Sequence, residues 1–222
     1  MNIAIDGPAG AGKSSIAKLV AKEMSFVYVD TGAMFRAMAY YCMTEGIDVS
    51  DERAVSDNCD NIDIRIEYQN GEQHIFMNGR DVSTEIRQEE VGKHASIMAS
   101  YGAVRTKLLE LQRKMAAETD VIMDGRDIGT VVLPEAEVKI FLTASSRVRA
   151  ERRYKELQEK GVECSLDKIE EDIVARDKQD MTREIAPLKQ AEDAVLVDTS
   201  YMSIEEVTKT IREIAERVQE EK

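Results

Sequence analysis

Short apolar runs alternate along most of the chain with segments of helical periodicity. Five runs are typical of buried strands, at residues 2–6, 26–30, 121–124, 138–143 and 194–198. Helical spacing marks residues 13–24, 33–43, 146–160, 166–180 and 204–218, with another helix centred on residues 108–115. Because strand and helix alternate, the pattern predicts an α/β fold with a parallel sheet and helices on both faces.

A different pattern appears between residues 58 and 97. The isoleucines at 62, 64 and 66 alternate with polar residues, which indicates a half-exposed strand. Asn70-Gly71 and Asn78-Gly79 are pairs typical of hairpin turns. We therefore predict a small antiparallel β insertion with a flanking helix at 58–97, and a core formed by residues 1–57 and 98–222.

Composition and charge narrow the class of protein. Hydrophobic residues make up 43% of the 222 residues, which is enough for a real core. No apolar run approaches the ~20 residues that span a bilayer, and the first residues lack the pattern of a signal peptide. We therefore expect a cytoplasmic protein without a membrane partner. The net charge of −13 argues against a generic nucleic-acid binder, so any anion site must be a local cluster of arginines.

The three cysteines, Cys42, Cys59 and Cys164, are scattered and odd in number. They predict neither a disulfide framework nor a zinc site, and we interpret them as ordinary reduced thiols. His74 and His94 match no catalytic triad, and we interpret both as structural.

The segment Gly7 to Ser14 matches the phosphate-loop pattern G-x-x-x-x-G-K-[ST] at every fixed position, with a predicted strand before it and a helix after it. Glycines let the backbone wrap closely around a phosphate, and the helix N-terminus favours its charge. Lys13 is suited to the β- and γ-phosphates, and the Ser14 hydroxyl to Mg²⁺. A plain glycine-rich turn is the structural alternative, but the sequence and its context together favour binding of a nucleoside triphosphate.

Phosphate binding alone does not distinguish GTPases, ATPases and small-molecule kinases. The chain has no N-K-x-D guanine motif, and it is short for a motor or transporter ATPase. Thr31, Arg36, Arg126 and Asp127 follow the ends of predicted strands, where sites of α/β sheets lie. Asp124 ends a strand and is placed to hold the magnesium shell, directly or through water.

Further arginines lie on predicted helices. Arg149, Arg152 and Arg153 share one helical face, which is either a solvated face or part of a lid over the transferring phosphate. Arg176, Asp180 and Arg183 share another face if the helix continues to residue 183, and this stripe suits an anionic ligand that carries hydroxyls.

Four segments together resemble the bacterial cytidylate kinases: GPAGAGKSS, DTGAMFR, MDGRDIGTVVLPEAEVKIFL and RDKQDMTREIAPL. The resemblance runs from Asn2 to the last helix. It implies a P-loop NTPase three-layer fold with a five-stranded parallel sheet, a monophosphate-binding insertion at 58–97 and a mobile helical lid at about 146–165. It also implies transfer of the ATP γ-phosphate to CMP or dCMP with Mg²⁺. We further expect a monomer, although the sequence itself does not show the oligomeric state.

The resemblance implies roles for individual residues. The ATP-binding residues would be Gly7, Pro8, Ala9, Gly10, Ala11, Gly12, Lys13, Ser14 and Ser15. Arg36, Arg126 and Arg176 would hold the CMP phosphate with Thr31 nearby, and Asp180 would meet the sugar hydroxyl. Ser96, Arg105 and Asp127 would read cytosine, helped by Arg183. The catalytic residues would be Lys13, Arg126, Asp127, Arg149 and Arg153, and the metal would be held by Ser14 and by Asp124 through water.

Two alternatives stay open at this point. One is a kinase for another small acceptor, such as UMP, AMP or shikimate. The other is a P-loop regulator that binds a nucleotide without transferring phosphate, against which the arginines argue because a switch protein needs only one phosphate site.

Overall fold

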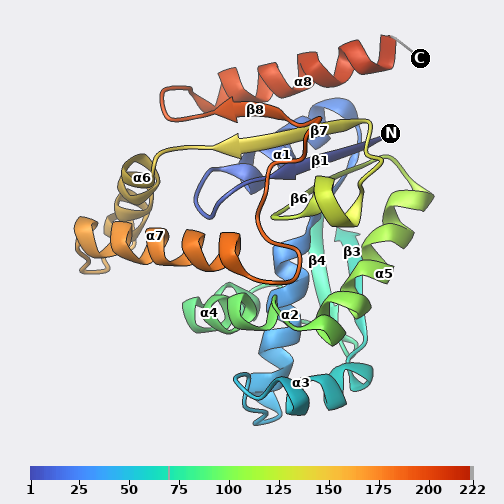
Figure 1. Cartoon of the computed structure of the whole chain (residues 1–222), viewed down its shortest axis with the longest axis vertical. Coiled ribbons are helices and arrows are strands. Elements are labelled where there is room, and N and C mark those ends of the chain that lie inside the picture. Colours follow the sequence, from blue (N-terminus) through green and yellow to red (C-terminus); the bar gives the residue numbers. More distant parts are fainter. Residues whose placement is uncertain (70, 221–222) are drawn as a thin grey trace. The chain divides into compact units, whose positions relative to one another are not determined.

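The computed structural model describes residues 1–69 and 71–220 (Figure 1). The chain divides into two compact units, which are described separately. The first unit consists of Met1–Tyr28 and Thr119–Lys222, and the second consists of Val29–Glu118. The predicted insertion at 58–97 falls within the second unit, and its role as a monophosphate-binding subdomain stays a prediction.

The larger sheet has the strand order β2-β6-β1-β7-β8. Its strands are β1 (Asn2–Asp6), β2 (Val27–Asp30), β6 (Val121–Gly125), β7 (Val138–Thr143) and β8 (Val195–Asp198). β1 pairs in parallel with β6 and β7, and β7 pairs in parallel with β8. The predicted five-stranded parallel sheet is therefore confirmed. β8 lies at the edge of the sheet, where Leu196 is exposed.

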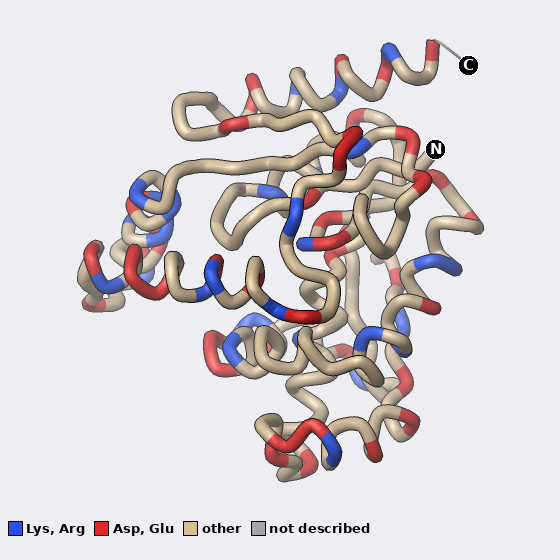
Figure 2. The backbone as a smooth tube through the Cα atoms, viewed as in Figure 1, with Lys and Arg blue, Asp and Glu red and all other residues tan. Residues whose placement is uncertain are grey.

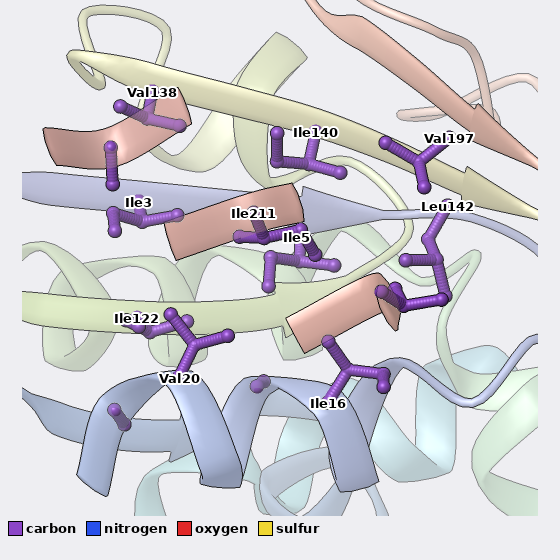
Figure 3. Packing of buried hydrophobic residues seen from close by; sticks show 14 of the residues in the cluster. Ile3, Ile5, Ile16, Val20, Ile122, Val138, Ile140, Leu142, Val197 and Ile211 are labelled. Carbon is purple, nitrogen blue, oxygen red and sulfur yellow. The ribbon is translucent and has the colours of Figure 1, made fainter. Parts of the chain in front are cut away.

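Helices α1 (Lys13–Met24) and α8 (Ile204–Glu220) pack against each other and against this sheet. Ile16 and Val20 of α1 and Ile211 of α8 join the strand residues Ile5 and Ile140 in one buried cluster (Figure 3). β-branched side chains dominate the strands here because both faces of a central parallel strand are buried. This packed cluster fixes the strand ends from which the site residues project.

Helices α6 (Ser146–Glu159) and α7 (Leu166–Thr182) form a pair in the same unit. Ser145 caps α6 by accepting a hydrogen bond from the Val148 amide, as an N-cap serine commonly does. α7 ends at Thr182, and Arg183 is its C-cap residue in an extended conformation. The condition under which Arg183 would share a helical face with Arg176 and Asp180 is therefore not met, although the Arg183 amide still donates a hydrogen bond to the Gln179 carbonyl of the last turn.

The second unit combines a small antiparallel sheet with helices. The sheet contains β3 (Ile64–Gln69), β4 (Glu72–Met77) and β5 (Arg80–Asp81). Asn78 and Gly79 both have positive φ, of 49° and 83°, so this turn matches its prediction as a two-residue hairpin loop. The other predicted turn includes Asn70, which lies outside the described residues.

The helical elements of the second unit are α2 (Thr31–Thr44), α3 (Glu52–Asn58), η1 (Cys59–Asn61), η2 (Glu85–Arg87), α4 (Glu89–Met98) and α5 (Gly102–Glu118). α2 packs against α4, α5 and β4. The short α3 was not predicted. It is started by Asp51, whose carboxylate accepts hydrogen bonds from the amides of Arg53 and Ala54.

Two further expectations concern the cysteines and helices that could span a membrane. The three cysteines are free thiols, as predicted. Within residues 1–69 and 71–220, no helix is both long enough and apolar enough to cross a membrane.

Candidate active site

The loop Gly7–Ser14 follows β1 and leads into α1. Gly7 has a φ of 147°, and a Cβ there would lie 1.9 Å from the Leu142 carbonyl oxygen, so only glycine fits. Gly12 is the N-cap of α1, with a left-handed φ of 87°. The conformation that the motif requires is therefore present, with the amides of the first helical turn of α1 at its end.

Lys13 is buried in this loop, with only 5% of its surface exposed. Its ammonium donates a hydrogen bond to the Pro8 carbonyl at 2.8 Å. Burial and the nearby Arg126 guanidinium lower the Lys13 pKa to about 7, whereas Asp124, Asp6 and Asp180 act in the opposite direction. A bound phosphate would add negative charge beside Lys13 and favour its protonated form.

Ser14 and Asp124 meet where a magnesium ion is expected. The Ser14 hydroxyl donates to the Asp124 carboxylate at 2.8 Å, and the Tyr28 hydroxyl donates to its other oxygen at 2.8 Å. A hydroxyl that donates in this direction keeps its lone pairs for a cation. No cluster of three or more His, Cys, Asp or Glu side chains suited to a metal occurs among the described residues. One hydroxyl and one carboxylate do fit Mg²⁺, which commonly keeps waters and takes other ligands from the substrate phosphates.

Two ion pairs join the segment after β6 to the end of α7. The Arg126 guanidinium donates to Asp180 at 2.9 Å, and that of Arg183 donates to Asp127 at 3.2 Å. The side chains of the second pair are both 7% exposed. Four of the predicted acceptor-binding residues are thus brought together in one unit. The fifth predicted residue of this unit, Arg176, is exposed on α7.

Asp6 is a further buried acid beside this segment. Its carboxylate accepts hydrogen bonds from the Ile128 and Gly129 amides at 2.8 and 2.7 Å. Burial raises the Asp6 pKa to about 6, and the two hydrogen bonds from backbone amides partly oppose that rise. The two amides begin η3 (Ile128–Val132), a short π-helical segment that was not predicted.

Several basic residues lie along α6 (Figure 2), and their side chains differ in environment. Arg149 is buried, forms a two-point pair with Asp177 at 3.1 and 2.6 Å, and donates to the Ala9 carbonyl of the phosphate loop. Arg152 donates to the Thr199 carbonyl at 2.7 Å. The side chain of Arg153 is 43% exposed and pairs with Glu156. The interpretation of these arginines as a solvated helix face therefore holds for Arg153 and not for Arg149.

In the second unit, Thr31 and Arg36 lie in the first two turns of α2. Thr31 is buried, and Arg36 pairs with Asp30 at 3.0 Å. Asp30 also caps α2 by accepting from the Ala33 amide, and its own amide donates to the Gln73 side chain of β4. The small sheet thereby supports the residue that orients Arg36.

The other two predicted base-reading residues also belong to the second unit. Ser96 lies in α4, and Arg105 lies in the first turn of α5. The Arg105 guanidinium donates to the Ala99 carbonyl at 3.0 Å and lies 5.7 Å from the centre of the Phe35 ring. This stacking on the residue before Arg36 limits the movement of the Arg105 head group.

Sequence reasoning missed four acidic or hydroxyl side chains that bond to predicted site residues or to the segment that carries them: Asp6, Tyr28, Asp30 and Asp177. Asp30 and Asp177 lie within quoted motifs, Asp6 directly precedes one, and Tyr28 lies two positions before one. A search for carboxylates at the ends of the strands that carry motifs would have found Asp6 and Asp30. The partners of Asp177 and Tyr28 depend on contacts between distant segments, which the sequence pattern does not reveal.

Comparison with known proteins identifies the family. The family model described as cytidylate kinase matches residues 3–217. The chain belongs to the cytidylate kinase family. A cytidylate kinase of Lactobacillus johnsonii is 48% identical over 219 residues, which cover 99% of this chain and 95% of that protein. A cytidylate kinase of Bacillus cytotoxicus is 49% identical over 216 residues, which cover 96% and 95%.

The fold also occurs in a distant solved structure. An uncharacterized protein from Eubacterium ventriosum matches with a TM-score of 0.55 at 11% identity, over 97% of this chain and 98% of that one. At this identity the likeness supports the fold alone. The family membership rests on the sequence matches, and the range 3–217 of the family model spans all four quoted segments.

Proposed function

We propose that this protein transfers the γ-phosphate of ATP to CMP or dCMP and releases ADP with CDP or dCDP. The carrying observation is that the phosphate loop and the Gly125–Asp127 segment follow neighbouring strands of one sheet, in a chain that belongs to the cytidylate kinase family. The reaction would serve pyrimidine nucleotide metabolism in the cytoplasm, carried out by a monomer.

The donor half of the site is the loop Gly7–Ser15. Its amides and Lys13 would hold the ATP phosphates, while Ser14 and Asp124 would hold Mg²⁺, which supplies charge neutralisation between the phosphates. Lys13 would leave the Pro8 carbonyl for a phosphate oxygen, since an anionic acceptor makes the stronger hydrogen bond.

The acceptor half consists of charged side chains. Arg36, Arg126 and Arg176 would hold the CMP phosphate, and Asp180 would accept a hydrogen bond from the sugar hydroxyl. One oxygen of that phosphate attacks the γ-phosphorus, and the bond to the β-phosphate oxygen breaks to release ADP. The attacking oxygen is already anionic, so the reaction needs no general base.

Base recognition would use Ser96, Arg105, Asp127 and Arg183. Cytosine offers acceptors at O2 and N3 and a donor at its 4-amino group, which an aspartate can accept. Uracil has a carbonyl in place of that amine, so Asp127 would face another acceptor. An unpaired buried polar group costs about 1–3 kcal/mol, which gives roughly ten- to a hundredfold discrimination.

Arg149 and Arg153 would neutralise charge on the transferring phosphate. Arg149 already reaches the phosphate loop through the Ala9 carbonyl, which supports a place beside the ATP phosphates. Arg153 lies one helical turn further along α6 and is exposed, so it would need lid closure to approach them.

An ADP-release assay with CMP, dCMP, UMP, AMP and shikimate tests the proposal. We expect the highest kcat/KM with CMP or dCMP, and no activity without Mg²⁺. A preference for UMP, AMP or shikimate would contradict the assignment of the acceptor. ADP release with none of them, together with no binding of a monophosphate in equilibrium dialysis, would instead favour the regulatory alternative.

A further inference from the structure

Asp6 lies between the phosphate loop and the segment after β6, and the proposed reaction gives it no role. It is the last residue of β1 and directly precedes Gly7 of the phosphate loop. In the parallel register of β1 and β6, Asp6 lies opposite Gly125. The residue is 4% exposed, and its carboxylate accepts two backbone hydrogen bonds, one on each oxygen, from the Ile128 and Gly129 amides.

The two amides are the donors that a helix leaves unpaired in its first turn. The residue at the N-cap position of η3 is Asp127, and aspartate is among the residues that most often cap such donors with their own side chain. Asp127 makes no side-chain cap bond here. Asp6 supplies both acceptors from a neighbouring strand, and the Asp127 carboxylate pairs with Arg183 instead.

The packing around Gly129 shows how closely this turn approaches Asp6. A Cβ at Gly129 would lie 3.4 Å from an Asp6 carboxylate oxygen and 3.2 Å from the Lys139 side chain. Asp127 and Asp6 also repel each other electrostatically, which disfavours movement of Asp127 toward the same amides. The turn, Asp6 and Arg183 thus act together on the position of the Asp127 carboxylate.

We propose that Asp6 is a positioning residue that caps the η3 turn and thereby keeps the Asp127 carboxylate in its pair with Arg183, where it reads the acceptor base. The proposal rests on the proposed function in one respect, because base reading by Asp127 belongs to it. Without the Asp6 carboxylate, the Asp127 carboxylate caps the two η3 amides from its N-cap position and turns away from the base.

The kinetic test compares the wild type with Asp6→Asn, Asp127→Ala and the double variant. In Asp6→Asn, one oxygen acceptor becomes an NH₂ group that faces an amide donor. We expect the ratio of kcat/KM for CMP over UMP to fall roughly tenfold or more. The double variant should have the ratio of Asp127→Ala alone, because both changes act through one carboxylate. The dissociation constant for ATP should also rise, because the Asp6 carboxylate raises the pKa of Lys13, so the CMP over UMP ratio is the readout and not either rate constant alone.

A general loss of stability would not produce this pattern, because it lowers the active fraction for CMP and UMP equally. Asp51→Asn is the matched control. The Asp51 carboxylate also accepts hydrogen bonds from two backbone amides at the start of a helix, but that helix lies in the second unit. Its CMP over UMP ratio should equal that of the wild type. An unchanged ratio in Asp6→Asn, or effects of Asp6→Asn and Asp127→Ala that multiply in the double variant, overturns the proposal.

Hydrogen–deuterium exchange of a peptide spanning residues 126–132, measured without nucleotide, provides a test that needs no activity. We expect faster exchange in Asp6→Asn than in the wild type and in Asp51→Asn, because the Ile128 and Gly129 amides lose an acceptor. If the wild type phosphorylates neither CMP nor UMP, the proposed function fails, and unchanged exchange then overturns the capping role of Asp6 by itself.

Discussion

The loop Gly7–Ser14 and the segment Gly125–Gly129 follow β1 and β6, which are parallel neighbours, yet they keep their shapes by different means. The loop depends on backbone conformation, since Gly7 and Gly12 have φ values that other residues rarely adopt. The segment depends on side chains, through the pairs Arg126–Asp180 and Arg183–Asp127 and through Asp6.

This difference has a functional consequence. A triphosphate that binds the loop meets amides whose positions are fixed by the chain itself. A monophosphate that approaches Arg126 meets a guanidinium that already has Asp180 as its partner, so it competes with a protein carboxylate. We therefore expect substitutions in the Gly125–Gly129 segment to affect acceptor binding and specificity and to leave ATP binding largely unchanged.

The largest effect is expected for Arg126→Ala. The substitution removes a charge-assisted donor to the acceptor phosphate, and removal of one such donor commonly lowers kcat about 10²–10³-fold. It also leaves the buried Asp180 without this partner. Steady-state kinetics with CMP and equilibrium binding of ATP should show a severe loss of kcat with ATP binding retained.

Arg53→Ala is the matched control, because the Arg53 side chain is 91% exposed and pairs only at 3.8 Å with Asp57 among the ion pairs described. It should leave the kinetics with CMP unchanged. A rate for Arg126→Ala equal to that of this control would remove Arg126 from the mechanism.

The next largest effect is expected for Asp127→Ala. Loss of the carboxylate should lower the preference for CMP over UMP roughly ten- to a hundredfold. It also leaves Arg183 buried without this acid, and breaking a buried pair commonly lowers the free energy of unfolding by about 3–5 kcal/mol. Competition kinetics and chemical denaturation measure the two effects separately.

Removal of both partners, in Asp127→Ala with Arg183→Met, should restore part of the lost stability because neither charge of this pair is then left buried without the other. The same double variant should remain unselective between CMP and UMP. Selectivity equal to that of the wild type in Asp127→Ala would show that another residue reads the base.

A smaller effect, about tenfold per pH unit, is expected from Lys13. Its pKa is lowered to about 7 in the free protein, so above pH 7 the side chain is increasingly neutral. Bound phosphates favour the protonated form, so ATP binding at pH 8 should take up close to one proton. The apparent affinity for ATP should accordingly fall as the pH rises above 7, and should be nearly constant below it.

Isothermal titration calorimetry in two buffers of different ionisation enthalpy measures this uptake directly. Lys13→Met should bind ATP more weakly and without the linked proton. An equal uptake in Lys13→Met would assign the proton to another group.

The sequence predicts the loop Gly7–Ser14 better than the segment Gly125–Gly129. The reason is again that backbone conformation shapes the loop, whereas side chains from distant positions shape the segment. The loop Gly7–Ser14 is local, so its spacing of glycines, Lys13 and Ser14 predicts both its conformation and its ligand. The five strands follow equally well from their apolar runs. The ends of elements are less certain, as the helix end before Arg183 shows, because a cap residue can keep its contacts after helical conformation stops.

The segment after β6 illustrates what the sequence does not reveal. The motif predicts that Arg126 and Asp127 lie at the site, but not that Asp180 and Arg183 are their partners, because these pairs join residues more than 50 positions apart. Likewise, the sequence alone indicates only that Asp6 is the polar last residue of a strand. Its role emerges only when β1 and β6 are paired, since the amides that it accepts from lie beyond the end of the neighbouring strand.

The smallest effect is expected in the second unit, where Arg36 depends on a weaker, partly exposed pair with Asp30. A Cβ at Gly32 would lie 3.2 Å from both the Arg36 guanidinium and the Asp30 carboxylate. Gly32→Ala should therefore shift Arg36 by a few tenths of an ångström. We expect the KM for CMP to rise about threefold, which corresponds to ~0.7 kcal/mol, with little change in ATP binding.

The stability of this variant should move in the opposite direction. Alanine is favoured over glycine inside a helix by roughly 0.5–1 kcal/mol, so Gly32→Ala should unfold at an equal or higher temperature than the wild type. Gly92→Ala in α4 is the matched control, because beyond its chain neighbours and the nearby backbone of its own helix no described atom lies within 4 Å of the new Cβ. It should gain stability without any change in KM. A raised KM in both variants would mean that helix rigidity, and not the position of Arg36, governs binding of the acceptor in this unit.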